Sequence, residues 1–217
     1  ANFKCSGLVK IRASIVDCFP TNARERGLQR SKLWHEWLLR RLESVFHSVK
    51  LPNQPEIADL GAGGCVVSAC LSKMGASVTC VDTWNEYRQD VTCGGGLIYG
   101  CAKELLSSVN KMGLSIVQHD LANRPWPLPE NHFDAITFFD VIEHISLGRD
   151  VYGAVGEIKR ICKPGGVVFV TTPNTAMLRN RLKALFGMSV YPDLDRWLRE
   201  SPYAGHAREF TFNELRC

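Results

Sequence analysis

The chain has 217 residues, with 26 Lys and Arg against 22 Asp and Glu, which gives a formal net charge of +4. This length fits one substantial domain and is too short for two ordinary ones. The small basic excess is not that of a dedicated nucleic-acid binder, and no apolar run approaches the roughly 20 residues that span a bilayer, so we expect neither a nucleic-acid partner nor a transmembrane segment.

The first 50 residues are predicted to form a helical segment that packs on or caps the core. Residues 1–20 fit a short helical segment that ends at Phe19-Pro20, and residues 22–49 fit one long helix. Most apolar residues of the long helix follow an i, i+4, i+8 spacing, which predicts one buried stripe. The members of this stripe are Leu28, Leu33, Trp34, Trp37, Leu38, Leu42, Val45 and Phe46.

From residue 51 onward, predicted strands alternate with predicted helices. The strands are expected at 57–60, 78–81, 115–118, 135–139 and 167–171, and the helices at 66–74, 102–111 and 151–161. The last of these helices should stop at the Lys-Pro-Gly-Gly sequence of residues 163–166. Such alternation predicts an α/β, Rossmann-like, doubly wound fold with a mostly parallel sheet and helices on both faces.

Acidic residues follow four of the predicted strands. Asp59, Asp82, Asp120 and Asp140 lie at or just beyond the strand ends. Ligands of open α/β sheets bind outside the carboxyl ends of the strands, so these side chains are candidates for one ligand site. Each could instead only cap a turn, which aspartate does well.

Five motifs in order closely resemble the class I S-adenosylmethionine-dependent methyltransferases, in the small-molecule branch that includes the ubiquinone and menaquinone biosynthesis enzymes. The similarity spans residues 56–174 and thus about half of the chain. The motifs are Asp-Leu-Gly-Ala-Gly-Gly at 59–64, Val-Asp at 81–82, Pro-Leu-Pro-Glu-Asn-His-Phe-Asp at 127–134, Asp-Val-Ile-Glu-His-Ile at 140–145 and Lys-Pro-Gly-Gly at 163–166.

The resemblance implies S-adenosyl-L-methionine as the methyl donor and suggests a role for each matching residue. Gly61 and Gly63 would approach the methionyl part and the ribose, because glycine lets a ligand lie against the main chain. Asp59 would help to hold the methionine ammonium group. Asp82 would accept hydrogen bonds from the ribose hydroxyls, as an acidic residue does at this point of dinucleotide-binding folds.

The same resemblance assigns residues to the adenine, the donor methyl and the acceptor. Asp120 and Leu121 would flank the adenine, and Asp140 would line the donor methyl group. His144 is the candidate general base for an acceptor hydroxyl, since histidine titrates near neutral pH. His144 could also merely cap or pack the next helix, and Glu143 could orient His144 or bind a cation. We predict no metal site, because the nine cysteines lack a Cys-x-x-Cys pair and fit reduced thiols of a cytoplasmic protein.

The acceptor side is predicted to lie in residues 175–210. This segment contains an amphipathic basic helix at 177–186, followed by Tyr191, Trp197 and Tyr203 and by a sequence in which His206 and Arg208 would face the acceptor. A small-molecule acceptor that is aromatic or lipid-like would suit these residues, and the basic helix would allow peripheral membrane contact. A solvated helix face is the simpler interpretation of its Arg and Lys residues.

Three further interpretations remain open at this point. The family resemblance covers the domain at 51–217, but the two final strands of the family, an antiparallel hairpin at the sheet edge, would be missing from a chain that stops at Cys217. A nicotinamide-dependent oxidoreductase also fits Gly61-x-Gly63 followed by Asp82, although Val66 occupies the third fingerprint position. A non-catalytic nucleoside-binding or scaffold protein would fit too. The residues do not distinguish oxygen from carbon methylation.

Overall fold

The computed structural model describes residues 3, 6–15, 18, 32–84, 102–145, 149–191, 194 and 206–216. Five strands form one sheet in the order β3-β2-β1-β4-β5, and every neighbouring pair is parallel. The strands are β1 (Glu56–Leu60), β2 (Ser77–Asp82), β3 (Ser115–Gln118), β4 (Phe133–Phe139) and β5 (Cys162–Thr171). The predicted parallel α/β sheet is therefore confirmed.

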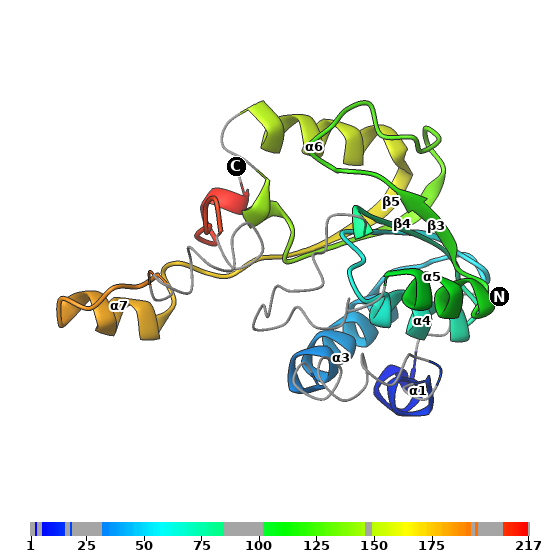
Figure 1. Cartoon of the computed structure of the whole chain (residues 1–217), viewed down its shortest axis with the longest axis horizontal. Coiled ribbons are helices and arrows are strands. Elements are labelled where there is room, and N and C mark those ends of the chain that lie inside the picture. Colours follow the sequence, from blue (N-terminus) through cyan, green and yellow to red (C-terminus); the bar gives the residue numbers. More distant parts are fainter. Residues whose placement is uncertain are drawn as a thin grey trace.

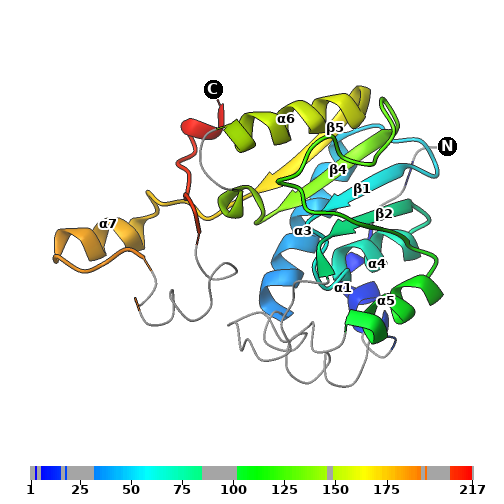
Figure 2. The ribbon, with the colours of Figure 1, turned by 45° about the horizontal axis from the view of Figure 1, so that its top comes forward.

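Helices cover both faces of this sheet (Figure 1 and Figure 2). One face carries α1 (Leu8–Ile15), α3 (Lys32–Ser48), α4 (Val66–Lys73) and α5 (Ala102–Lys111), whose buried side chains form one core cluster with Ile57 and Val78. The other face carries α6 (Arg149–Ile161), which packs on Leu60, Ile136 and Phe138. Strand β1 lies in the middle of the sheet and its residues 57–60 are buried on both faces, including the carboxylate of Asp59.

Helix α3 buries part of the expected stripe. Leu38, Leu42 and Phe46 are buried as expected, together with Leu39 and His35, whereas Leu33 (80%), Trp37 (47%) and Val45 (39%) are exposed. The prediction was wrong for these three residues, because it counted only apolar residues and therefore left a polar histidine out of the buried face. Residues 22–31, at the start of the predicted helix, lie outside the described residues.

Residues 163–166 do not form the expected turn between helix and strand. They belong to β5, which already pairs Cys162 with Phe133 before the register shifts and Val167 pairs with Ala135. Residues 163–166 of β5 thus lie opposite the single residue Asp134 of β4. One of these four residues, Gly165, has a positive φ of 81°. The motif is a bulge at the start of the edge strand, where such irregularities are common.

Two further segments lie beyond β5. Helix α7 (Leu178–Leu185) has no buried residue and projects away from the sheet (Figure 1). Near the end of the described residues lies a short 3₁₀ turn, η6 (Glu214–Arg216). Among the described residues, no helix has both the length and the apolar character required to cross a bilayer.

The buried histidine of α3 predicts acid sensitivity. Burial, assisted by the nearby Arg12 charge, lowers the pKa of His35 to about 4 from its ordinary value of 6.5. Between these values the unfolded chain binds a proton that the folded chain does not, so this contribution is complete above pH 6.5 and is lost as the pH falls toward 4. We expect the unfolding free energy to fall by at most about 3 kcal/mol from this group over that range.

Urea unfolding at a series of pH values between 7 and 4 measures this loss. His35→Gln should flatten the decline, whereas His47→Gln, which changes an exposed histidine of the same helix, should leave it unchanged. An equally steep decline in His35→Gln would contradict the assignment.

Candidate functional site

The loop that follows β1 lies between the end of β2 and the segment that follows β4. The amide of Gly61 donates to the carbonyl of Val81 at 2.8 Å. Gly61 has a φ of 73°, and a Cβ added there would lie 2.2 Å from Cγ2 of Val141. Only glycine fits such a position, because it has neither the Cβ nor the penalty for a positive φ.

Two hydrogen bonds then fix Gly63 to the end of β2. Its amide donates to Oδ2 of Asp82 at 2.7 Å, and its carbonyl accepts from Nε1 of the buried Trp84 at 2.8 Å. The other oxygen of Asp82 accepts from the amide of Thr83 at 2.7 Å. The Thr83 hydroxyl also donates to this oxygen at 3.4 Å, so the carboxylate of Asp82 is held in place at the end of β2.

Asp59 is buried within the sheet rather than exposed at its edge. One oxygen accepts from the hydroxyl of Ser68 on α4, and the other accepts from the hydroxyl of Thr137 on β4 at 2.7 Å. Burial raises the pKa of this carboxyl, and the two hydroxyl bonds oppose the rise. Asp59 therefore links β1 to α4 and to β4, two residues before the glycine loop begins.

Asp120 and Leu121 follow β3, next to the end of β2. The amide of His119 donates to the carbonyl of Asp82 at 2.9 Å, which holds the two strand ends together. Asp120 accepts from the amide of Ala122 at 2.9 Å and so caps a turn, and Leu121 is buried. The structure thus brings Asp82 and Asp120 together at the carboxyl ends of β2 and β3, while Asp59 is buried near the carboxyl end of β1.

Asp140 begins the segment after β4 in a left-handed conformation, with a φ of 51°. Its amide donates to the carbonyl of Thr171, and its carboxylate accepts from the Thr171 hydroxyl, both at 2.9 Å. These bonds fix the start of the 3₁₀ turn η5 (Ile142–His144) against the end of β5.

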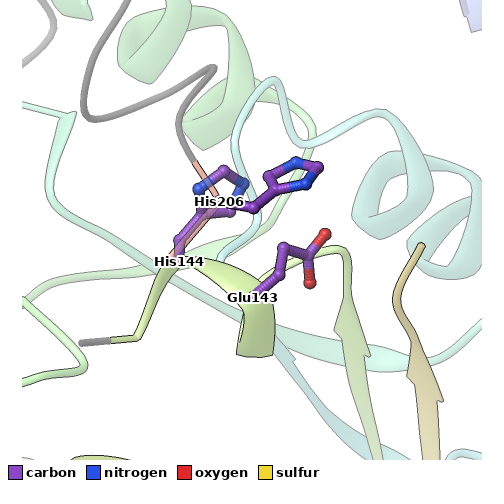
Figure 3. A group of neighbouring side chains, drawn as sticks. All are labelled: Glu143, His144 and His206. Carbon is purple, nitrogen blue, oxygen red and sulfur yellow. The ribbon is translucent and has the colours of Figure 1, made fainter. Parts of the chain in front are cut away.

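Two residues of η5 and one residue 62 positions later form a compact cluster (Figure 3). The ligand atoms of Glu143, His144 and His206 lie within 4.8 Å of one another, and the two imidazole centroids are 5.0 Å apart. The carbonyl of Glu143 accepts from the amide of Ala207 at 2.7 Å and from that of Arg208 at 3.3 Å. These main-chain bonds hold the later segment against η5.

The charge of this cluster is unusual. Burial raises the pKa of Glu143 to about 7, and the negative charges of Asp140 and Glu209 add to the rise. Sequence reasoning noted Glu143 and His206 separately but did not join them, because no short-range spacing connects residues so far apart. Trp84 was missed as a partner of Gly63 for the same reason.

An apolar groove of about 410 Å³ lies on α7, the helix that Figure 2 shows apart from the sheet. Leu178 is 71% exposed and Phe186 is 74% exposed. The lining residues alternate apolar and basic character: Leu178, Arg179, Leu182, Lys183, Phe186 and Met188. Trp197 and Tyr203, which the sequence placed near the acceptor, lie outside the described residues.

Comparison with known proteins matches a methyltransferase domain family to residues 58–170, just over half of the chain. A ubiquinone biosynthesis O-methyltransferase of Colwellia psychrerythraea is 27% identical over 169 residues, covering 75% of this chain and 61% of that protein. The corresponding protein of Nitrosospira multiformis is 29% identical over 135 residues, covering 61% and 47%. The chain thus spans less than two thirds of the length of these relatives.

Solved structures show the same fold at low identity. An S-adenosylmethionine-dependent methyltransferase of Thermotoga maritima superimposes with a TM-score of 0.54 at 18% identity, covering 87% of this chain and 72% of that one. A methyltransferase of Archaeoglobus fulgidus gives a TM-score of 0.52 at 15% identity, covering 83% and 65%. The family match favours methyl transfer over the nicotinamide interpretation.

The close approach at Gly61 predicts a specific loss of stability. Gly61→Ala should cost about 1–2 kcal/mol for the left-handed backbone and about 1–3 kcal/mol more for the collision with Val141. Gly113→Ala is the matched control, because Gly113 has a φ of 76° and no atom within 4 Å of the added Cβ. Urea unfolding should show the larger loss in Gly61→Ala. The cost of Gly61→Ala should shrink in a Val141→Ala background, and equal costs in both backgrounds would contradict the collision.

Proposed function

The chain belongs to the methyltransferase domain family of the class I S-adenosylmethionine-dependent methyltransferases, and from this we propose that it moves a methyl group from S-adenosyl-L-methionine to an oxygen or carbon of a small-molecule acceptor. The observation that carries the proposal is the glycine loop held on Asp82 at the edge of a parallel sheet. Val141 packs against the main chain at Gly61, so the start of the loop is fixed and Gly63 is held beside the carboxylate of Asp82.

Each candidate residue has a proposed part in donor binding. Asp82 would accept from the ribose hydroxyls, and its bonds to Gly63 and Thr83 hold it in place for that task. Gly61 and Gly63 would present main chain to the ribose and the methionyl part. Asp59 would favour the donor's ammonium group through its charge, either directly or through water.

On the other side, Asp120 and Leu121 would flank the adenine, and Asp140 would line the reacting methyl group. When bound, the donor supplies a methyl group on a positively charged sulfur, which becomes a neutral thioether once the acceptor has taken the methyl. The chain's own task is mainly alignment, because such a displacement needs the acceptor atom in line with the methyl and the sulfur.

We assign His144 to the activation of the acceptor. It is exposed, follows Asp140 by four residues and lies at the end of β4. A neutral imidazole at this place would take the proton of an acceptor hydroxyl as the oxygen attacks. The names of the sequence relatives, all O-methyltransferases, support an oxygen acceptor.

We further propose that residues 175–210 form the acceptor side of a domain at 51–217, with residues 1–50 as a helical cap. The cap is supported by the core that α1 and α3 share with α4. The acceptor side is supported by the exposed apolar and basic groove on α7, which suits an aromatic or lipid-like molecule or an anionic membrane surface. The free thiols of Cys65, Cys70 and Cys80 support a reducing, cytoplasmic location.

Donor binding tests the first part of the proposal. Asp82→Asn should weaken the binding of S-adenosylhomocysteine by about 1–3 kcal/mol, because charge-assisted hydrogen bonds to the ribose are lost. Isothermal titration calorimetry measures this change. Asp134→Asn is the matched control, because Asp134 lies near the opposite end of β4 and pairs with Lys163. Unchanged affinity in Asp82→Asn would remove the ribose assignment, and tight binding of NAD alone would support the oxidoreductase instead.

Transfer of a labelled methyl group tests the acceptor side. We expect phenols with a long alkyl chain to be methylated with a lower KM than the same phenols without the chain, because the α7 groove would hold the chain. Leu182→Ser together with Phe186→Ser should raise KM at least several-fold for the long acceptor only. An equal effect on both acceptors would contradict a role of the groove, and the absence of transfer to any phenol would count against the proposed reaction.

A further inference from the structure

The cluster of Glu143, His144 and His206 has the composition of a metal site. One carboxylate and two imidazoles converge from two segments of the chain (Figure 3), and their ligand atoms lie within 4.8 Å of one another. Two ligands of one ion, each bound at about 2.0–2.2 Å, lie at most a little more than 4 Å apart. Only a small contraction would therefore bring all three onto one ion.

The buried carboxylate of Glu143 is an independent indication of a ligand. The residue is 0% exposed, and among the described residues neither carboxylate oxygen meets a donor in hydrogen-bond geometry. Burial raises the pKa of this carboxyl, and interactions with its own main chain and with the Thr172 hydroxyl oppose the rise without cancelling it. A buried charge with so little compensation is costly, and the nearby Asp140 and Glu209 increase the local negative charge. A cation is the partner that removes this cost.

The surroundings of His206 also fit a ligand. Its Nδ1 lies 2.9 Å from Oε1 of Glu209. When the ring proton is on Nδ1 and is donated to Glu209, Nε2 carries a lone pair that can bind an ion. Metal-binding histidines nearly always donate their other ring nitrogen to a carboxylate or a carbonyl in this way. The side chain of Glu209 therefore selects the tautomer that can bind an ion.

We propose that Glu143, His144 and His206 bind a divalent first-row transition-metal ion, and that this ion holds the oxygen of the acceptor. Two imidazoles with one carboxylate favour ions such as Mn²⁺, Fe²⁺ or Zn²⁺ over Mg²⁺, which prefers oxygen ligands throughout. Three protein ligands leave coordination positions open, which is the pattern of a site that receives a substrate.

The role of the ion rests on the proposed function, whereas its binding does not. An acceptor hydroxyl bound to the ion loses its proton more readily, because the positive charge stabilises the resulting oxyanion. The proton passes to solvent water and the oxygen keeps its electron pair for the attack on the methyl group. In this mechanism His144 binds the ion, and the ion replaces His144 as the group that activates the acceptor hydroxyl.

Titration of the chelator-treated protein with Mn²⁺, followed by electron paramagnetic resonance, tests the site without any acceptor. Mn²⁺ is the appropriate probe, because the cysteine thiols of this chain would compete for Zn²⁺. We expect one Mn²⁺ per chain and nitrogen couplings from imidazole in the pulsed spectrum. Glu143→Gln and His206→Gln should each weaken binding at least about tenfold. His132→Gln, which changes an exposed histidine outside the cluster, should not.

A stability measurement separates loss of the site from loss of the fold. Without the ion, Glu143→Gln should melt no lower than wild type, because it removes an unpartnered buried charge. With Mn²⁺, only wild type should gain stability. Binding to wild type no tighter than to Glu143→Gln, or bound Mn²⁺ without nitrogen coupling, would overturn the proposal.

The ion site and the reaction can fail separately. If Mn²⁺ binds at the cluster and no phenol is methylated, the proposed function is contradicted and the site stands. If chelator-treated protein methylates phenols at the full rate, the role of the ion is contradicted and the function stands.

Discussion

The site depends on one close approach, that of the loop after β1 to the segment after β4. Because Gly61 lacks a Cβ, Val141 can lie against the main chain of the loop. The loop then reaches the end of β2, where Gly63 donates to Asp82 and accepts from Trp84. These contacts join three strand ends, so the acidic residue that ends β2 has a fixed position relative to the main chain of the glycine loop. Binding of a nucleoside would require no reordering of these joined ends, which lowers the entropic cost of association.

The two buried carboxylates of the site show opposite ways of handling charge. Asp59 accepts from hydroxyls of α4 and β4, so its burial is compensated within the fold and contributes to the joining of three elements. Glu143 is just as buried, but its main chain and the Thr172 hydroxyl compensate it only in part, and burial raises its pKa to about 7. The bonds to Asp59 show that this fold can compensate a buried carboxylate. The weaker compensation of Glu143 is therefore not forced by the fold. Such local cost is typical of functional positions rather than of structural ones.

Sequence periodicity predicted the sheet well and the helix faces less well. The strands at 115–118 and 135–139 were identified because runs of β-branched and aromatic residues lie between clear turn signals. Leu33 and Trp37 of α3 were predicted to be buried but are exposed, whereas the polar residue His35 lies on the buried face of the helix. The motif at 163–166 was taken for a turn, whereas its glycine and proline permit a bulge inside β5. Local sequence marks where the strands end, and the positions of the acidic site residues could be predicted from these ends. The contacts between segments far apart in the sequence could not be predicted in this way.

The contact of η5 with the segment at 206–210 is the clearest case of such a distant relation, and it joins the proposed acceptor segment to the residues after β4. The main chain of Glu143 accepts from Ala207 and Arg208, and Phe210 is paired with Asn174 just beyond β5. These bonds already hold His206 beside His144 before any ligand arrives. An ion at the cluster would therefore bind to preformed ligands, and it would fasten the acceptor segment to the end of β4, next to Asp140. Acceptor activation and acceptor positioning would then depend on the same three side chains, which explains why a buried charge is tolerated there.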